Sequence, residues 1–366
     1  MTLEEKSCWH WFMSIPISYM GQRKLIECYG TPERVMKAPE EKIIEIIGRD
    51  SFGIEYLKNS KNTDWKKACE DMEAQGIRFT LKGEEGYPAA LLPLADAPYG
   101  LYHIGELPQE EMCVAVIGAR SCSRYGLEMA RETGALLAGA GVPVISGMAR
   151  GIDGAAQWAA LEHGGKSCAV LGCGVDICYP RENEPLYERL KANGAIISEY
   201  PPGTEGLPWR FPYRNRIISG LCKALVVVEA RKRSGTLITA DYALEHGRDI
   251  YAVPGRTTDA LSAGCNELIR NGAGILVSPE KLLEDLGLNV KQNEKNSKKS
   301  GIRLAKKENM VYSCLDLNPK GAEVIKIETG LPMTEIMGAM VSLQLKGLVV
   351  EAGTGCYARA GRGGSV

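Results

Sequence analysis

Short apolar runs alternate with amphipathic stretches through the middle of the chain, from Met112 to Val277. The runs are rich in β-branched residues, which is typical of strands buried in a parallel sheet covered on both faces. The stretches between them repeat apolar residues at helical spacing. We expect strands at 113–118, 142–147, 167–172, 195–200, 224–230, 249–254 and 274–277, and helices at 127–140, 154–163, 185–193, 237–246 and from Asn266. This alternation predicts an α/β fold, an extended Rossmann-like parallel sheet with helices on both faces.

The segments on either side of this core have different patterns. Residues 1–75 carry apolar positions at helical spacing, with Pro32 at the start of one helix and Gly48 at the end of the next. This pattern predicts a small helical domain. Residues 80–110 are rich in Pro, Gly and Tyr and indicate a connector with a short strand at 100–104.

The C-terminal part predicts a second small domain. The core, assigned to residues 76–288, is followed by a polar Lys, Asn and Ser-rich segment at 289–308, which we interpret as a flexible linker. Residues 309–366 predict three helices and a hairpin, the outline of a winged helix. The third helix, at 333–346, contains a single basic residue, Lys346. We therefore expect a protein contact or a structural role for this domain rather than groove reading.

Two basic segments, both expected to be loops, flank the apolar strand at 224–230. Arg214-Asn215-Arg216 precedes the strand, and Arg231-Lys232-Arg233-Ser234-Gly235-Thr236 follows it and opens a helix. Loop amides, hydroxyl groups and the positive end of a helix dipole together favour an anion. Basic residues outnumber acids between Glu205 and Arg233. We interpret the region as a site for phosphate groups in a row; the alternative is a solvated charged edge.

Arginines also follow the first two core strands. Arg120 and Arg124 lie in the turn after the first strand, and Arg150 lies in the turn after the second. Arg120 occupies the second Gly position of a GxGxxG turn, which disfavours NAD binding. Asp153 is interpreted as a partner that orients an arginine.

Because the carboxyl ends of parallel strands meet at one edge of a sheet, Arg120, Arg150, Arg214, Arg216 and the 234–236 loop are expected to converge. A polynucleotide strand needs this many cations, whereas one small phosphate does not. Nearby aromatic side chains suit either base stacking or packing: Tyr125, Phe211 and Tyr213.

Composition narrows the class of protein. The chain has 366 residues and a formal net charge of -1, so it is no polycation, and any nucleic-acid binding must come from local clusters. It has no long apolar run and no signal-peptide layout, so we expect no membrane span and a cytoplasmic location. The 12 cysteines form no CxxC pair and are expected to be reduced. No metal-ligand spacing and no catalytic set emerges, so we expect no metal, no cofactor and no enzymatic activity.

Several of these motifs, in this order, resemble the DNA-processing protein A family, DprA, also called Smf. They include VAVIGARSCSRYG at 114–126, SGMARGIDGAAQWAAL at 146–161 and the long run from FPYRNRIISG at 211 onwards, and the likeness covers roughly residues 80–280. The resemblance implies a core that binds single-stranded DNA, forms a homodimer and loads RecA recombinase in natural transformation. It also implies the DNA-facing positions Arg120, Arg150, Arg214, Asn215, Ser234, Gly235 and Thr236.

The sequence departs from the family pattern at two places. Gly118-Ala119-Arg120 replaces a Gly-Ser-Arg turn and keeps the arginine, whereas residues 14–18 replace a Gly-rich turn of a helix-hairpin-helix. The second change argues against DNA contact by the N-terminal domain.

Two alternatives remain. A nucleotide phosphoribohydrolase of the lonely-guy type resembles this fold branch, but Thr239 stands where that family has its catalytic Glu. The other alternative is an interaction module that happens to be basic. Binding of oligo-dT at low salt would distinguish a single-stranded DNA-binding protein from such a module.

Overall fold

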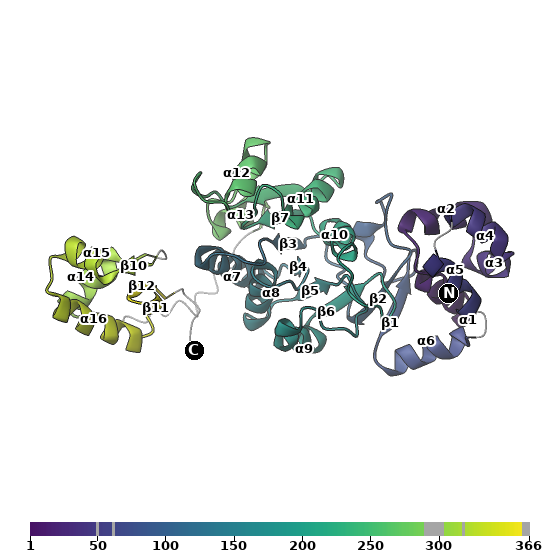
Figure 1. Cartoon of the computed structure of the whole chain (residues 1–366), viewed down its shortest axis with the longest axis horizontal. Coiled ribbons are helices and arrows are strands. Elements are labelled where there is room, and N and C mark those ends of the chain that lie inside the picture. The colour runs from purple at the N-terminus through teal and green to yellow at the C-terminus, as the bar shows by residue number, and fades with distance from the viewer. Residues whose placement is uncertain (49–50, 61–62, 289–303, 317–318, 361–366) are drawn as a thin grey trace.

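In the computed structural model, the described residues are 1–48, 51–60, 63–288, 304–316 and 319–360. A nine-stranded sheet occupies the middle of the molecule, with six helices beyond one edge and a small separate unit on the other side (Figure 1). The strand order is β1-β2-β6-β5-β4-β3-β7-β8-β9. The seven strands from β6 to β9 in this order pair in parallel, and β1 and β2 are antiparallel additions. The predicted α/β class with a Rossmann-like, mostly parallel sheet is confirmed.

The elements of the core lie close to their expected ranges. The strands are β1 (Arg78–Leu81), β2 (Gly100–Gly105), β3 (Val114–Ile117), β4 (Val144–Ser146), β5 (Ser167–Val170), β6 (Ala195–Ser198), β7 (Ala224–Val227), β8 (Asp249–Ala252) and β9 (Gly274–Ile275). The helices are α7 (Arg124–Gly139), α8 (Ile152–Glu162), α9 (Glu184–Asn193), α10 (Arg210–Leu221), α11 (Gly235–Glu245), α12 (Ala263–Arg270) and α13 (Pro279–Asp285). The prediction of a loop at 214–216 is wrong, because these residues belong to α10.

Successive side chains along each strand point to opposite faces of the sheet, so the hydrophobic core has two parts, one on each face. Val114 and Val226 point to the face that α7, α8 and α13 cover, whereas Ala115 and Val227 point to the face that α10, α11 and α12 cover. This period of two is what a pleated strand imposes, and it explains why strands buried on both faces are apolar throughout.

The N-terminal helices pack on the β1–β2 edge and share a core with it. They are α1 (Leu3–Ser14), α2 (Tyr19–Tyr29), α3 (Pro32–Lys37), α4 (Glu40–Ile47), α5 (Ser51–Ser60) and α6 (Trp65–Ala74). The Phe79 and Tyr102 rings stack with centroids 4.4 Å apart, and Tyr102 OH lies 2.8 Å from His10 Nδ1. This aromatic cluster joins the helices to the sheet. Helix α3 begins at Pro32 after the Thr31 cap, and helix α4 ends before Gly48, so both expected helix boundaries are confirmed.

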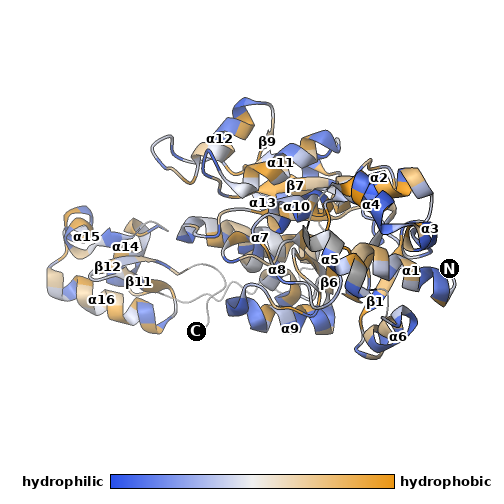
Figure 2. Cartoon of the chain, turned by 45° about the vertical axis from the view of Figure 1, so that its right-hand side comes forward, coloured by the Kyte–Doolittle hydropathy of each residue, from blue (hydrophilic) through white to orange (hydrophobic). Residues whose placement is uncertain are grey.

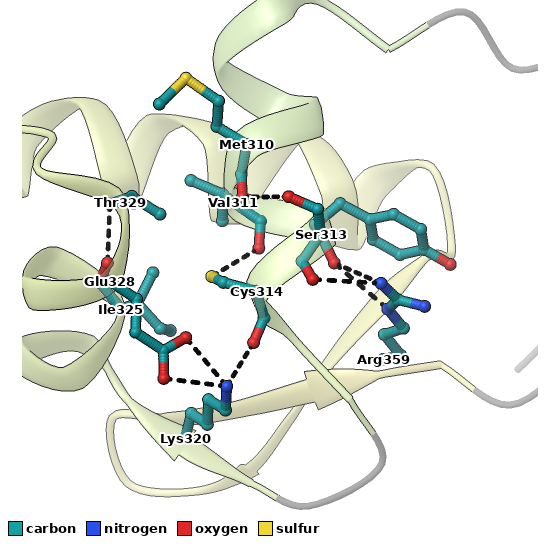
Figure 3. A network of polar contacts seen from close by, with 10 residues as sticks. Met310, Val311, Ser313, Cys314, Lys320, Ile325, Glu328, Thr329 and Arg359 are labelled. Carbon is teal, nitrogen blue, oxygen red and sulfur yellow. Dashed lines mark hydrogen bonds and ion pairs between the residues drawn. The ribbon is translucent and has the colours of Figure 1, made fainter.

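The C-terminal unit contains three helices and a small antiparallel sheet. Its elements are α14 (Lys306–Cys314), β10 (Lys320–Gly321), α15 (Ala322–Thr329), α16 (Met333–Leu345), β11 (Val349–Gly353) and β12 (Cys356–Arg359). Lys320 bridges Glu328 and the Cys314 carbonyl, and Arg359 donates to the carbonyls of Tyr312 and Ser313 (Figure 3). Orange, apolar residues occur along the whole of α16 (Figure 2), because Met337, Val341 and Leu345 are exposed while Ile336, Met340 and Leu343 are buried.

Candidate functional site

A pocket of about 270 Å³ opens at the carboxyl ends of β3 and β7. The chain runs from β3 to its neighbour β4 on one side and returns with β7 on the other, so the strand order reverses there. Open α/β sheets bind ligands in the crevice at such a switch point. The walls are the turn after β3, the first half of α10 and the turn that opens α11.

The turn after β4 is held rigidly below this pocket. Gly147 N donates to Asp153 Oδ2 at 3.1 Å, and Met148 N donates to Gln157 Oε1 at 3.0 Å. Met148 is buried with a φ of 53°, a left-handed conformation that a side chain adopts only when its surroundings impose it. Gly151 has a φ of 78°, and a Cβ there would lie 2.4 Å from the Ala119 carbonyl oxygen. The turns after β3 and β4 therefore pack against each other.

Arg214 lies in the wall of the pocket and is almost fully buried. Its Nη1 donates to the Gly147 carbonyl at 3.2 Å, and its Nε donates to Asn215 Oδ1 at 3.2 Å. Burial lowers the pKa of Arg214 to about 10, and the nearby Asp153 acts in the opposite direction. Burial raises the pKa of Asp153, and Arg214 opposes that change. The guanidinium stays charged at neutral pH with few solvent contacts, a condition that strengthens its attraction for an anion.

Arg120 extends over the mouth of the pocket and is exposed. Its guanidinium carbon lies 5.8 Å from the centre of the Phe211 ring. Phe211 in turn stacks on Tyr179, with ring centroids 4.9 Å apart. Arg120, Phe211 and Arg214 also line a smaller adjacent hollow together with Arg150. One continuous surface thus joins two hollows.

The turn that opens α11 supplies hydrogen-bond groups without protein partners. Ser234 occupies the N-cap position, yet its side chain makes no capping hydrogen bond. Its Oγ is buried and has no hydrogen-bond partner in the structure. A buried hydroxyl without a partner is costly, so a ligand at this helix N-terminus would satisfy it.

The structure brings most of the sequence-predicted site residues together. The residues that line the pocket are Arg120, Arg214, Asn215, Ser234, Gly235 and Thr236. Arg150 lies in the adjacent hollow, where it pairs with Glu182 at 3.2 Å. Arg124 lies in the first turn of α7 and donates to the Arg359 carbonyl of β12 at 3.0 Å. It lines neither hollow.

The expectation that Arg216 faces the same site is corrected. Arg216 is 1% exposed, pairs with Glu199 at 2.5 Å and lies over the Tyr213 ring at 4.1 Å. The reason is helical geometry, because positions 214 and 216 of a helix point about 200° apart.

Sequence reasoning did not single out Tyr179 and Ser121. Ser121 lines the main pocket and Tyr179 lines the smaller hollow. Tyr179 precedes Pro180 in the long turn after β5, and an aromatic–proline pair at the carboxyl end of a strand could have drawn attention to it.

Among the described residues, no group of His, Cys, Asp or Glu side chains has a metal-binding arrangement. The twelve cysteines are free thiols. Within the same ranges, no helix combines the length and the apolar character that a membrane span requires.

The fold and the pocket define a Rossmann-like α/β protein with arginines at the switch point of its sheet. Residues 78–287 match the family model described as DNA recombination-mediator protein A, and the chain belongs to this family. Membership gives it a role in DNA processing and recombination.

Named relatives support the assignment. The chain is 42% identical over 203 residues to the DNA processing protein DprA of Streptococcus pneumoniae, which covers 55% of this chain and 72% of the relative. The solved structure of S. pneumoniae DprA superposes with a TM-score of 0.64 at 35% identity, covering 78% of this chain and 98% of that one. A Helicobacter pylori DprA structure that concerns a single-stranded DNA binding mode superposes with a TM-score of 0.53 at 27% identity, covering 57% of this chain and 95% of that one.

Proposed function

We propose that this chain binds single-stranded DNA at the pocket between β3, α10 and α11, protects it and loads RecA recombinase onto it, without catalysing a reaction. The observation that carries the proposal is the convergence of Arg120 and Arg214 on the N-terminus of α11, where the Ser234 hydroxyl has no partner. Guanidinium groups, a free hydroxyl and helix amides together suit a phosphate group.

The shape of the site favours a strand over a single phosphate. The adjacent hollow, lined by Arg150, continues past Phe211, so that two phosphates of one backbone could be held in succession. Phe211 and Tyr179 offer aromatic surface beside the arginines, which suits bases of a single strand. The H. pylori relative, whose structure concerns single-stranded DNA binding, supports the same choice.

The alternative of a phosphoribohydrolase has less support. Thr239 lines the pocket at the position where the lonely-guy type has its acid. Asp153 is the one acid among the described residues of the lining, and its carboxylate accepts the Gly147 amide beside Arg214. A carboxylate held in this way is poorly placed to assist glycosidic cleavage.

We also propose that the chain forms a homodimer whose interface lies at the edge strand β9. β9 is an edge strand, and Ile275 and the nearby Val277 are 49% and 75% exposed. Exposed apolar residues on an open sheet edge favour pairing with a second chain. Light scattering of the wild-type chain and of Val277→Lys tests this: the mass should halve in the variant, and an unchanged mass excludes this edge.

A titration tests the main proposal. Oligo-dT and a duplex of equal length are titrated at several salt concentrations, and the single strand should bind more tightly, with a salt-dependent affinity. Equal affinity for both would contradict the proposal, and steady release of ribose phosphate from nucleoside monophosphates would favour the enzyme.

RecA loading needs a separate experiment. RecA filament assembly is followed on a single strand covered with a single-strand-binding protein, and the chain should accelerate this assembly.

A further inference from the structure

A second cavity, of about 490 Å³, lies between the N-terminal helices and the sheet. Its walls are the turn between α1 and α2, the segment before β2, the segment after β6 and the start of α10. Its size falls within the range of about 300–1,000 Å³ that small-ligand sites occupy. We call it the tyrosine cavity after Tyr19, Tyr99, Tyr200 and Tyr213, which line it.

The aromatic side chains form stacking surfaces around the cavity. The Tyr19 and Tyr99 rings stack with centroids 5.9 Å apart, and Tyr19 and Tyr213 lie 6.2 Å apart. The Arg210 guanidinium lies 4.9 Å from the Tyr200 ring and 5.0 Å from the Trp209 ring. Trp209 is 56% exposed, which is unusual for the largest apolar side chain. Flat surfaces of this kind bind flat ligands.

Polar atoms in the same walls lack partners. Glu199 Oε1, Tyr200 OH and Arg210 Nε are buried, and none of these three atoms has a hydrogen-bond partner in the structure. They include both donors and an acceptor. Glu199 and Asp96 also line the cavity, so an anion such as phosphate would meet carboxylates there. A neutral, planar group with its own donors and acceptors fits better, and a nucleobase has these properties.

The start of α10 separates the tyrosine cavity from the arginine-lined pocket. Arg210 and Tyr213 line the cavity, whereas Phe211 and Arg214 line the pocket. Positions i and i+3 share one side of a helix, and positions i+1 and i+4 share the next. The two sites are therefore one helix apart, about 10 Å, a distance that a few nucleotides span.

We propose that the tyrosine cavity is a base-binding subsite for the single strand whose backbone lies in the arginine-lined pocket. The strand crosses the N-terminus of α10, and one unstacked base enters between the tyrosines, where Glu199, Tyr200 and Arg210 hydrogen-bond its edge. This inference rests on the proposed function, since it takes the ligand of the first pocket to be single-stranded DNA.

The test combines protein variants with oligomers that lack one base. An abasic position is moved along an oligo-dT, which keeps the phosphates and removes a single base. At one position along the oligomer, removal of the base should weaken binding by the wild-type chain roughly tenfold. In Tyr200→Leu the same position should cost less than about twofold, because the stacking surface is already gone, and this non-additivity is the signature of direct contact. Tyr200→Phe should retain part of the effect.

Two further variants make the result decisive. Tyr125→Leu changes a tyrosine that is 40% exposed on α7 and lines neither site, so the tenfold effect should persist. Thr204→Trp fills the cavity without removing a tyrosine and should abolish the effect even if Tyr200→Leu fails to fold. Equal abasic costs in wild type and in Thr204→Trp would overturn the subsite while leaving strand binding in place. Absence of any oligomer binding by the wild type would instead overturn the proposed function, and this inference with it.

Discussion

Arg214 donates a hydrogen bond from Nη1 to the carbonyl oxygen of Gly147, and its guanidinium lies directly over that glycine. A Cβ at position 147 would lie 2.6 Å from Arg214 Nη2 and 2.9 Å from Asp153 Oδ2. Arg214 and Asp153 can therefore occupy the wall of the pocket only because residue 147 has no side chain.

Gly147→Ala should displace the Arg214 guanidinium and lower both stability and strand affinity. Overpacking of a buried site costs about 1–3 kcal/mol, which urea unfolding would measure. Gly139→Ala is the matched control, because this glycine ends α7 with nothing within 4 Å of the added Cβ. It should leave affinity unchanged and stability equal or slightly higher. Equal behaviour of the two variants would contradict the packing argument.

Arg120→Ala should weaken single-strand binding by tenfold or more while the fold is unchanged. The side chain is exposed, so its loss leaves no buried group without a partner. One lost phosphate contact should also reduce the slope of log affinity against log salt by about 0.7. Arg131→Ala, an exposed arginine on α7 that lines neither hollow, is the control. Unchanged affinity in Arg120→Ala would remove Arg120 from the site.

Ser234→Ala should reduce affinity without reducing stability. Its hydroxyl makes no capping bond, whereas a hydrogen bond to a charged phosphate is worth about 1.5–3 kcal/mol, or tenfold and more. Ser123→Ala should do the reverse, because Ser123 caps α7 through Gly126 N at 3.0 Å and also donates to Glu229. Loss of that cap should cost about 1 kcal/mol of unfolding free energy. Thermal unfolding and a strand titration on both variants separate the two roles.

His10 predicts a pH dependence of stability. Burial lowers the pKa of His10 to about 4, from an ordinary value of 6.5. Between these values the unfolded chain binds a proton that the folded chain does not, so stability is complete above pH 6.5 and falls as the pH drops towards 4. The full shift corresponds to about 3 kcal/mol.

The slope of unfolding free energy against pH should be smaller in His10→Gln, as urea unfolding at pH 7 and pH 5 would measure. His163→Gln replaces an exposed histidine and should keep the wild-type slope. An identical slope in wild type and His10→Gln would exclude His10 as the source.

Removal of residues 289–366 should change strand affinity by less than about threefold, or below 1 kcal/mol. Both hollows belong to the core, and the helix α16 contains no Lys or Arg within Met333–Leu345. The contact of Arg124 with the Arg359 carbonyl would be lost, which leaves Arg124 free to contact DNA. A loss of tenfold or more would show that the C-terminal unit takes part in binding.

The strands that carry the site could be predicted from the sequence, because strand patterning and parallel pairing were enough to place them. Apolar β-branched runs identified the strands, and parallel pairing brought Arg120 and Ser234 to one edge. Arg216 could not be placed in this way. The segment from Arg210 to Leu221 contains Pro212 and consecutive polar residues, which resemble a loop. In the structure it is a helix whose last turns bury Ile217, Ile218 and Leu221 in the core. A helix sends Arg214 and Arg216 to opposite sides, whereas a loop does not.

The tyrosine cavity was beyond prediction for another reason. Tyr19, Tyr99 and Tyr213 come from three distant segments, and no pattern in the chain links them. Their meeting depends on where the N-terminal helices rest on the sheet, which is set by the buried contacts of Phe79 and Tyr102.

The two edge strands of the central sheet, β1 and β9, differ in whether another strand can pair with them. At β1 the Lys6 ammonium group donates to the Phe79 carbonyl, so a charged side chain occupies the border where another strand would have to add. At β9, no further strand pairs with this edge among the described residues. If two copies pair through β9 about a twofold axis, as proposed above, no open edge is left among the described strands of the central sheet. Such an assembly ends as a dimer and does not grow into a fibre.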